Sequence, residues 1–81
     1  MDISQVKSEV DQILQSHFEI APDMLTEDAQ LYGELGLDSL DGADLLALLE
    51  SKLGQPIDPE VFMDARSLGD VYRIVSSLLV P

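Results

Sequence analysis

The sequence predicts an all-α fold: a small antiparallel helical bundle of three main helices plus one short helix, with a long loop between helices 1 and 2. Apolar residues recur at spacings of three and four in three segments, which is the period of an amphipathic helix. The four prolines fall outside these segments. The chain has 81 residues, of which 46% are hydrophobic, and this is enough for one modest core. We therefore expect residues 1–81 to form a single domain.

The first helix is expected over residues 3–17. Asp2, followed three positions later by Gln5, is a capping pair that fixes its start. Pro22 disfavours helix at the residue before it and ends the period. The apolar face of this helix comprises Ile3, Val6, Val10, Ile13 and Leu14, with Phe18 after them.

The connection over residues 20–38 contains no long regular element. A connection of this length is uncommon in a small domain, which indicates a functional or tightly anchored loop. Glycines at positions 33 and 36 and several acids separate its apolar anchors, which are Ile20, Met24, Leu25, Leu31, Leu35 and Leu37.

The second helix is expected from Ser39 to Leu53, because Gly54 and Pro56 stop it. A leucine stripe should face the core, while Asp41, Asp44 and Ala47 lie on other sides. Gly42 is unexpected inside this helix, where it costs about 1 kcal/mol relative to alanine. Frayed first turns or the close approach of a partner would explain it. The stripe comprises Leu45, Leu46, Leu49 and Leu53.

Two further helical segments complete the expected bundle. Residues 59–63 have room for one short helical turn anchored by Val61 and Phe62. Ser67 and Asp70 form another capping pair that opens the last helix. The apolar positions of the last helix are Leu68, Val71, Tyr72, Ile74, Val75, Leu78 and Leu79.

Composition limits the function classes. With 16 acidic and 4 basic residues the net charge is −12, so no nucleic-acid partner is expected and basic protein partners are favoured. The absence of cysteine excludes disulfides, a protein thiolate and Cys-based metal sites, and we expect no metal site. No signal peptide or membrane-spanning stretch is recognisable. We expect a free-standing, cytoplasmic monomer with no membrane insertion.

The stretch LGLDSLD places Ser39 between two acids where the second helix begins. A hydrolytic serine needs a base, and the single histidine, His17, has no specific reason to meet it. Position 37 is leucine rather than the glycine of a nucleophile elbow. Asp38 can cap the helix and leave the hydroxyl exposed. The helix dipole would attract a phosphate on Ser39 and the two acids would repel it, each by about 1 kcal/mol. Physical reasoning therefore leaves open a simple cap and a modified hydroxyl.

LGLDSLD, the following DLLALLE, LGQPIDPE before the short helix and the terminal ARSLGDVYRIVSSLL together resemble the acyl carrier protein family over most of the chain. The resemblance implies a non-catalytic carrier, with 4′-phosphopantetheine delivered from coenzyme A to Ser39 by a phosphopantetheinyl transferase that uses magnesium. Acyl groups would be held as thioesters on the cofactor's thiol, which accounts for the lack of cysteine.

The resemblance also makes the second helix the recognition helix. Its expected partners carry basic patches, as acyltransferases, ketosynthases or related biosynthetic enzymes do. The partner-recognition candidates are Asp38, Leu40, Asp41, Asp44, Ala47, Glu34 and Glu50. The acyl-pocket candidates are Leu45, Leu46, Leu49 and Leu53, for which core packing is the preferred reading.

Two residues indicate which biosynthetic pathway a carrier of this family would serve. Gly42 and the small Ala47, with the segment GQPIDPEVFMDARSL, favour polyketide or secondary-metabolite biosynthesis over fatty-acid biosynthesis. GLDS lacks the GGxS pattern of peptidyl carriers, which makes an aminoacyl cargo less suited. The alternative function is an acidic helical protein–protein adaptor without a prosthetic group, in which Ser39 only begins the helix.

Overall fold

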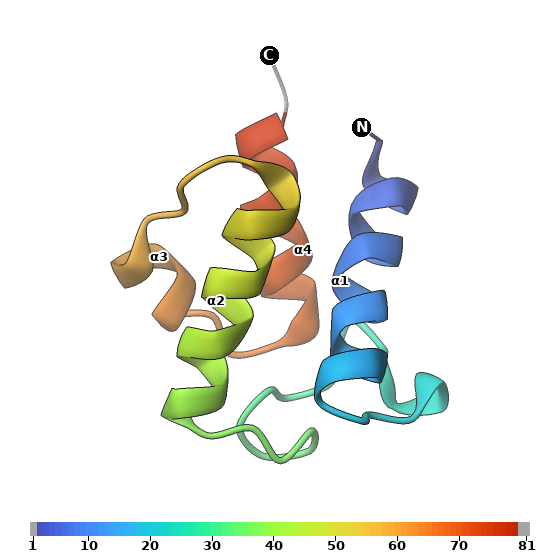
Figure 1. Ribbon diagram of the computed structural model, residues 1–81. Helices are drawn as coiled ribbons and strands as arrows, with labels where there is room; N and C mark the ends of the chain where they lie inside the picture. The colour runs from blue at the N-terminus through green and yellow to red at the C-terminus, as the bar shows by residue number, and fades with distance from the viewer. Residues whose placement is uncertain (1, 80–81) are drawn as a thin grey trace.

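The computed structural model describes residues 2–79, with side chains to residue 78. It confirms the all-α prediction of three main helices and one short one (Figure 1). α1, α2 and α4 form the body of the bundle, and α3 packs beside α2 and α4. The helices are α1 (Ile3–His17), α2 (Ser39–Leu53), α3 (Pro59–Met63) and α4 (Leu68–Leu79), with a 3₁₀ turn, η1 (Pro22–Met24), in the long loop.

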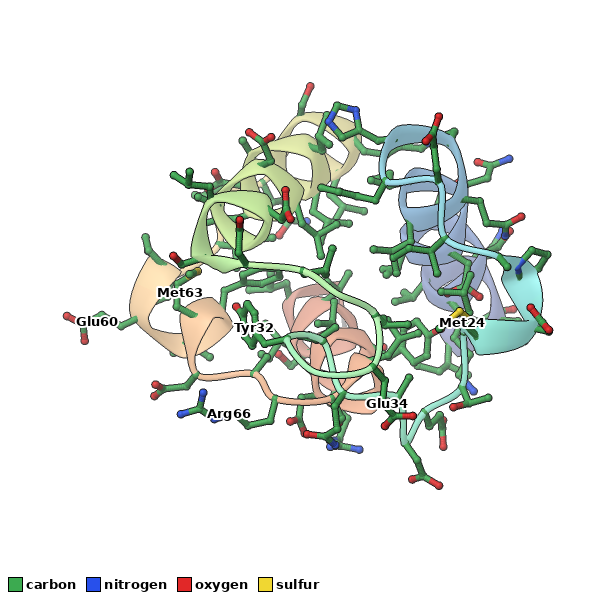
Figure 2. All side chains as sticks on the ribbon, turned by 90° about the horizontal axis from the view of Figure 1, so that it is seen from below. Met24, Tyr32, Glu34, Glu60, Met63 and Arg66 are labelled. Atoms are coloured by element: carbon green, nitrogen blue, oxygen red, sulfur yellow. The ribbon has the colours of Figure 1, made fainter. Side chains whose placement is uncertain are left out.

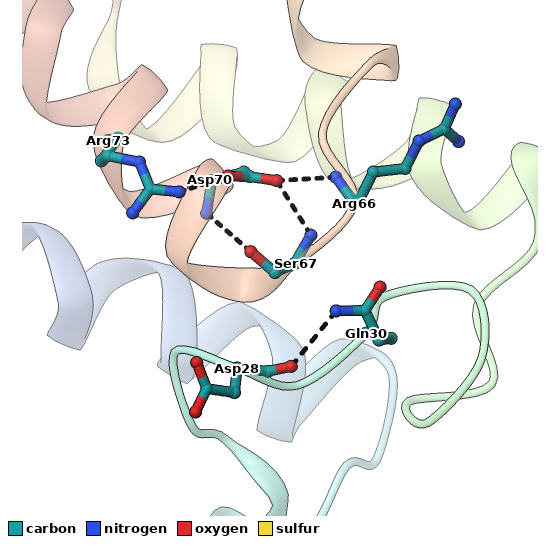
Figure 3. Close-up of polar contacts among 6 residues, drawn as sticks. All are labelled: Asp28, Gln30, Arg66, Ser67, Asp70 and Arg73. Atoms are coloured by element: carbon teal, nitrogen blue, oxygen red, sulfur yellow. Dashed lines mark hydrogen bonds and ion pairs between the residues drawn. The ribbon is translucent and has the colours of Figure 1, made fainter.

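The structure confirms the predicted helix starts. They could be predicted because the capping residues lie close to each other in the sequence. Asp2 and Gln5 exchange side-chain and backbone hydrogen bonds at α1, at 2.9 and 3.0 Å. At α4, Ser67 Oγ accepts from Asp70 N at 3.2 Å, and Asp70 Oδ2 accepts from Ser67 N at 3.1 Å (Figure 3). Gly54 ends α2 in the left-handed region, with φ of 67°.

α1 ends differently, with an ordinary residue in the left-handed region. Glu19 has φ of 58°, and Ile20 N donates to Leu14 O at 3.1 Å, a bond that closes the helix end. Glycine usually occupies such a position because it has no Cβ to clash there. The turn is therefore strained, and the buried side chain of Ile20 holds it in place.

The core lies between α1, α2 and α4 and extends under the loop. Three predicted apolar contacts are wrong: Ile3 and Val61 are each 50% exposed and Met24 is 43% exposed. α3 has only five residues and buries one side, which Phe62 occupies, so Val61 faces outward. The buried apolar side chains are Val6, Val10, Ile13, Leu14, Ile20, Ala29, Leu31, Leu35, Leu37, Leu45, Leu49, Ile57, Phe62, Ala65, Leu68, Val71, Tyr72 and Val75.

The long loop is fixed by backbone hydrogen bonds to the α3–α4 junction. Leu31 N donates to Arg66 O, and Leu68 N donates to Ala29 O, both at 2.9 Å. Gly69 N donates to a loop carbonyl at 2.9 Å, and a Cβ on Gly69 would lie only 3.0 Å from that oxygen. The loop therefore caps the free N–H groups of α4.

A polar cluster links α1, α4 and the loop. The Tyr72 hydroxyl donates to Asp11, while Lys7 pairs with Glu27 at 3.0 Å and lies over the Tyr72 ring. Burial, and next the hydrogen bond with Asp11, raise the pKa of Tyr72. Burial also raises the pKa of Asp11, against the opposing effects of Tyr72 and Lys7. The cluster fastens α1 to α4 on the side of the core next to the loop.

Candidate functional site

Ser39 is exposed at the first position of α2. Asp38 is the N-cap, with extended backbone angles (φ −115°, ψ −177°). Asp38 Oδ1 accepts from Asp41 N at 2.9 Å, and Asp41 Oδ2 accepts from Asp38 N at 3.2 Å. The two acids that flank the serine thus form the capping box themselves. No hydrogen bond of the serine hydroxyl is recorded within residues 2–79, so the cap does not engage it.

Buried leucines fix the approach of the chain to Ser39. Leu35 and Leu37 are both buried, and Gly36 between them has φ of 72°. Leu37 N donates to Leu31 O at 3.1 Å. The chain is therefore pinned on the core just before it enters α2, while Ser39 and Leu40 point out of the fold, with Leu40 78% exposed.

Gly42 is buried one turn after Ser39, and two half-buried side chains meet its backbone. A Cβ at Gly42 would lie 2.9 Å from Tyr32 Oη, 3.4 Å from Met63 Cε and 3.6 Å from Met63 Sδ. Tyr32 comes from the loop and Met63 from α3, and both approach the start of α2 (Figure 2). Internal packing therefore favours glycine at this position, and neither a frayed turn nor a partner is needed to explain it. Sequence reasoning missed Tyr32 and Met63, although a glycine inside a helix was a signal of close approach.

The acidic candidates for partner recognition differ in what they already contact. Glu34 is exposed, but its Oε1 accepts from Gln30 N at 3.1 Å. Glu50 is half-buried, and its Oε2 accepts from Ile57 N at 2.9 Å, which ties α2 to the α2–α3 connection. Asp44 is exposed, and no hydrogen bond or ion pair is recorded for it among the described residues. The remaining candidates are the exposed Asp38, Leu40 and Ala47 and the half-buried Asp41.

The four leucines considered for an acyl pocket belong to the core or pack against it. Leu45 and Leu49 are 1% and 0% exposed, and Leu46 and Leu53 are half-buried against the same cluster. A hollow of about 290 Å³ lies elsewhere, between α3 and α4. Its lining residues are Val61, Asp64, Ala65, Asp70, Arg73 and Ile74.

Nothing in the described chain activates Ser39. The His17 ring packs edge-on against Phe18, with centroids 4.8 Å apart, and no hydrogen bond joins His17 to Ser39 within residues 2–79. Over the same residues, no cluster of three or more His, Asp or Glu side chains could hold a metal ion. None of the helices described is long and apolar enough to cross a membrane.

This arrangement suits a group attached from outside. An exposed hydroxyl at the first position of a helix can accept a phosphoryl group supplied by another enzyme, and the helix dipole favours the resulting anion. Asp38 and Asp41 oppose that charge, so a phosphodiester with one charge fits better than a dianionic monoester. The site therefore fits a phosphate-linked prosthetic group.

Comparison with known proteins agrees with this chemistry. The family model described as the phosphopantetheine attachment site matches residues 8–75, a range that contains Ser39 and all of α2 and α3. Acyl carrier protein 2 of Ralstonia nicotianae is 39% identical over 79 residues, which cover 98% of each chain. The acyl carrier protein of Saccharopolyspora erythraea is 28% identical over 79 residues, 98% of this chain and 83% of its own.

Proposed function

The chain belongs to the phosphopantetheine attachment family of acyl carrier proteins, and from this premise we propose that Ser39 is the residue to which 4′-phosphopantetheine is attached. The observation that supports this most directly is the capping box of Asp38 and Asp41, which begins α2 without using the Ser39 hydroxyl. The bound group supplies a thiol on which acyl groups travel as thioesters, in a chain that has no cysteine of its own.

In the attachment step, the Oγ–H bond of Ser39 is replaced by an Oγ–P bond. The pyrophosphate linkage of coenzyme A breaks, adenosine 3′,5′-bisphosphate leaves, and the serine proton goes to a base on the transferase. The lack of a base beside Ser39 is consistent with a base on the transferase, because the carrier then supplies only an accessible hydroxyl. The role of this chain is to present that hydroxyl on a fixed helix start.

Partner recognition is proposed for the exposed side of α2 around Ser39. With a net charge of −12, the chain attracts basic surfaces, and such steering affects association rate and orientation more than affinity. Leu40 and Asp44 are the best placed of the candidates, because both are exposed, and no hydrogen bond or ion pair of the Asp44 carboxylate is recorded in the described chain. The proposed partners are a phosphopantetheinyl transferase and acyltransferases, ketosynthases or related enzymes with basic patches at their active-site mouths.

We place the carrier in polyketide or other secondary-metabolite biosynthesis rather than in fatty-acid biosynthesis. Ala47, an exposed residue on α2, presents little apolar surface to a partner. Gly42 allows the close packing of Tyr32 and Met63 beside Ser39. Both features set the surroundings of the attachment site apart from a recognition helix with larger apolar side chains.

Intact-mass measurement tests the attachment site. The chain is incubated with coenzyme A, Mg²⁺ and a broad-specificity phosphopantetheinyl transferase, beside Ser39→Ala and the matched control Ser51→Ala, an exposed serine on the same helix. We expect the mass to rise by one phosphopantetheinyl group in the parent and in Ser51→Ala, and not in Ser39→Ala. Modification of Ser39→Ala would refute the assignment. A folded, unmodified parent that gains no mass would favour the adaptor.

A further inference from the structure

One face of α2 connects Ser39 to the leucine stripe, and Gly42 lies between them. Gly42 follows Ser39 by three residues, Leu46 follows Gly42 by four, and Leu49 follows Leu46 by three. Residues at these spacings share a helix face. A chain attached at Ser39 that runs along this face toward the leucines must therefore pass the backbone of Gly42.

Two side chains occupy that passage. Tyr32 Oη and Met63 Cε lie 2.9 and 3.4 Å from the place where a Cβ on Gly42 would stand. We call them the Tyr32–Met63 wedge; one comes from the loop and the other from α3 (Figure 2). Because Gly42 has no side chain, the wedge contacts the helix backbone, and an added chain would have to displace at least one of the two side chains.

Within the described residues, the core beyond the wedge has no free space for an alkyl chain that would offset the cost of displacing Tyr32 or Met63. Leu49 is 0% exposed and Leu45 is 1% exposed, so both are already packed in the core. Protein interiors are close-packed, and inserted methylene groups force neighbouring side chains and backbone to shift. An alkyl chain that stays outside instead keeps its apolar surface in water, which becomes less favourable with each added methylene.

We propose that the Tyr32–Met63 wedge excludes long alkyl chains from the interface between α2 and α3, so that an alkyl chain carried at Ser39 stays in solvent. The proposal rests on the attachment of the arm at Ser39. Tyr32 is the main determinant, because its hydroxyl makes the closest approach to Gly42. Met63 lies farther from Gly42, and its flexible, unbranched side chain can adapt to a neighbouring group.

The test compares two acyl groups on the same protein. Acetyl- and octanoyl-phosphopantetheine are transferred to Ser39 from the corresponding coenzyme A thioesters, and intact mass confirms loading. The rate of thioester cleavage by hydroxylamine and the melting temperature of each loaded form are then measured. A sequestered thioester is cleaved more slowly, in proportion to the fraction of time that it spends inside.

In the parent protein we expect octanoyl and acetyl thioesters to be cleaved at rates within about twofold of each other, with the same melting temperature. In Tyr32→Ala, octanoyl should be cleaved at least about fivefold more slowly than acetyl and should raise the melting temperature. Tyr32→Phe, which keeps the ring, serves as the milder variant if Tyr32→Ala does not fold, and should show a smaller effect in the same direction. Phe18→Ala removes a half-buried aromatic ring at the end of α1 and should leave the two rates equal.

The outcomes separate the two proposals. Parent protein that loads on Ser39 and protects octanoyl at least about fivefold would overturn the exclusion by the wedge while leaving the carrier function intact. Equal rates in the parent and in both Tyr32 variants would also overturn it, because the wedge would then not control access. Failure of any acyl group to load on Ser39 would remove the carrier assignment and the wedge proposal with it.

Discussion

Replacement of Gly42 by alanine sets two opposing effects against each other in α2. Alanine stabilises a helix interior by about 1 kcal/mol relative to glycine. The new Cβ would lie 2.9 Å from Tyr32 Oη, although ordinary van der Waals contact begins at 3.4 Å, so the tyrosine must move by about half an ångström. Overpacking costs about 1–3 kcal/mol. We expect Gly42→Ala to lower the free energy of unfolding by about 1 kcal/mol.

The same substitution should raise the free energy of unfolding, rather than lower it, when the Tyr32 hydroxyl is absent. In Tyr32→Phe, the nearest atom to the new Cβ becomes Met63 Cε at 3.4 Å, so most of the gain of about 1 kcal/mol from alanine is retained. The coupling between the two positions is then about 2 kcal/mol, as expected for residues in contact. For a domain of this size that corresponds to roughly 10 °C in melting temperature.

The coupling is measured by thermal and urea unfolding, monitored by circular dichroism, of the parent, Gly42→Ala, Tyr32→Phe and the double variant. Gly42→Ala in the Tyr72→Phe background is the matched control, because the Tyr72 hydroxyl contacts Asp11 and does not lie near Gly42. There the effect of Gly42→Ala should equal its effect in the parent. If alanine stabilises the parent and Tyr32→Phe equally, Tyr32 does not pack on α2 and the reasoning is refuted.

Five further changes have expected outcomes. Glu19→Gly should raise the free energy of unfolding by about 0.5–1 kcal/mol, measured in urea, because the left-handed turn after α1 suits glycine; no gain would show that the turn is unstrained. Hydrogen bonds from two backbone N–H groups lower the pKa of Asp70 to about 2, from 3.8. Its stabilisation is therefore complete above pH 3.8 and lost as the pH falls through about 2, so Asp70→Asn should flatten the acid-unfolding profile in that window. Glu50→Ala should lower the free energy of unfolding by about 1 kcal/mol through loss of the bond from Ile57 N. Asp44→Ala should instead slow association with a basic partner without lowering the melting temperature. Added salt or millimolar Mg²⁺ should raise the melting temperature by screening a net charge of −12, and a melting curve insensitive to both would mean that the acids are well separated.

The helices were predictable because the signals for their ends are local. Asp2 with Gln5, and Ser67 with Asp70, specify a helix start within four residues, and Gly54 specifies an end. No neighbour distant in sequence is needed to read them. The exposed position of Ser39 follows from the same local chemistry, because the preceding residue is the cap.

The path of the loop and the surroundings of Gly42 were not predictable from the sequence. The loop is held by backbone bonds to residues more than thirty positions away, such as Leu31 N to Arg66 O, and backbone groups carry no sequence signal. The contact of Gly42 with Tyr32 and Met63 joins three segments, and only the glycine hinted at it. Val61 was misplaced because a helix of five residues is too short for periodicity to identify its buried side.

The order of Asp38 and Ser39 gives the start of α2 both a capped helix end and a serine hydroxyl that the cap does not use. Serine is itself a good N-cap, but a capping serine uses its oxygen to accept a backbone N–H, and its rotamer is then fixed toward the helix. An aspartate one position earlier takes that role and moves the serine to the first helical position, where its hydroxyl faces solvent. Asp41 completes the box from the other side, so the serine stands between two carboxylates that hold the backbone rather than the hydroxyl. The acids around Ser39 therefore stabilise the helix start before any partner is present, and we propose that their negative charge also attracts a basic enzyme surface.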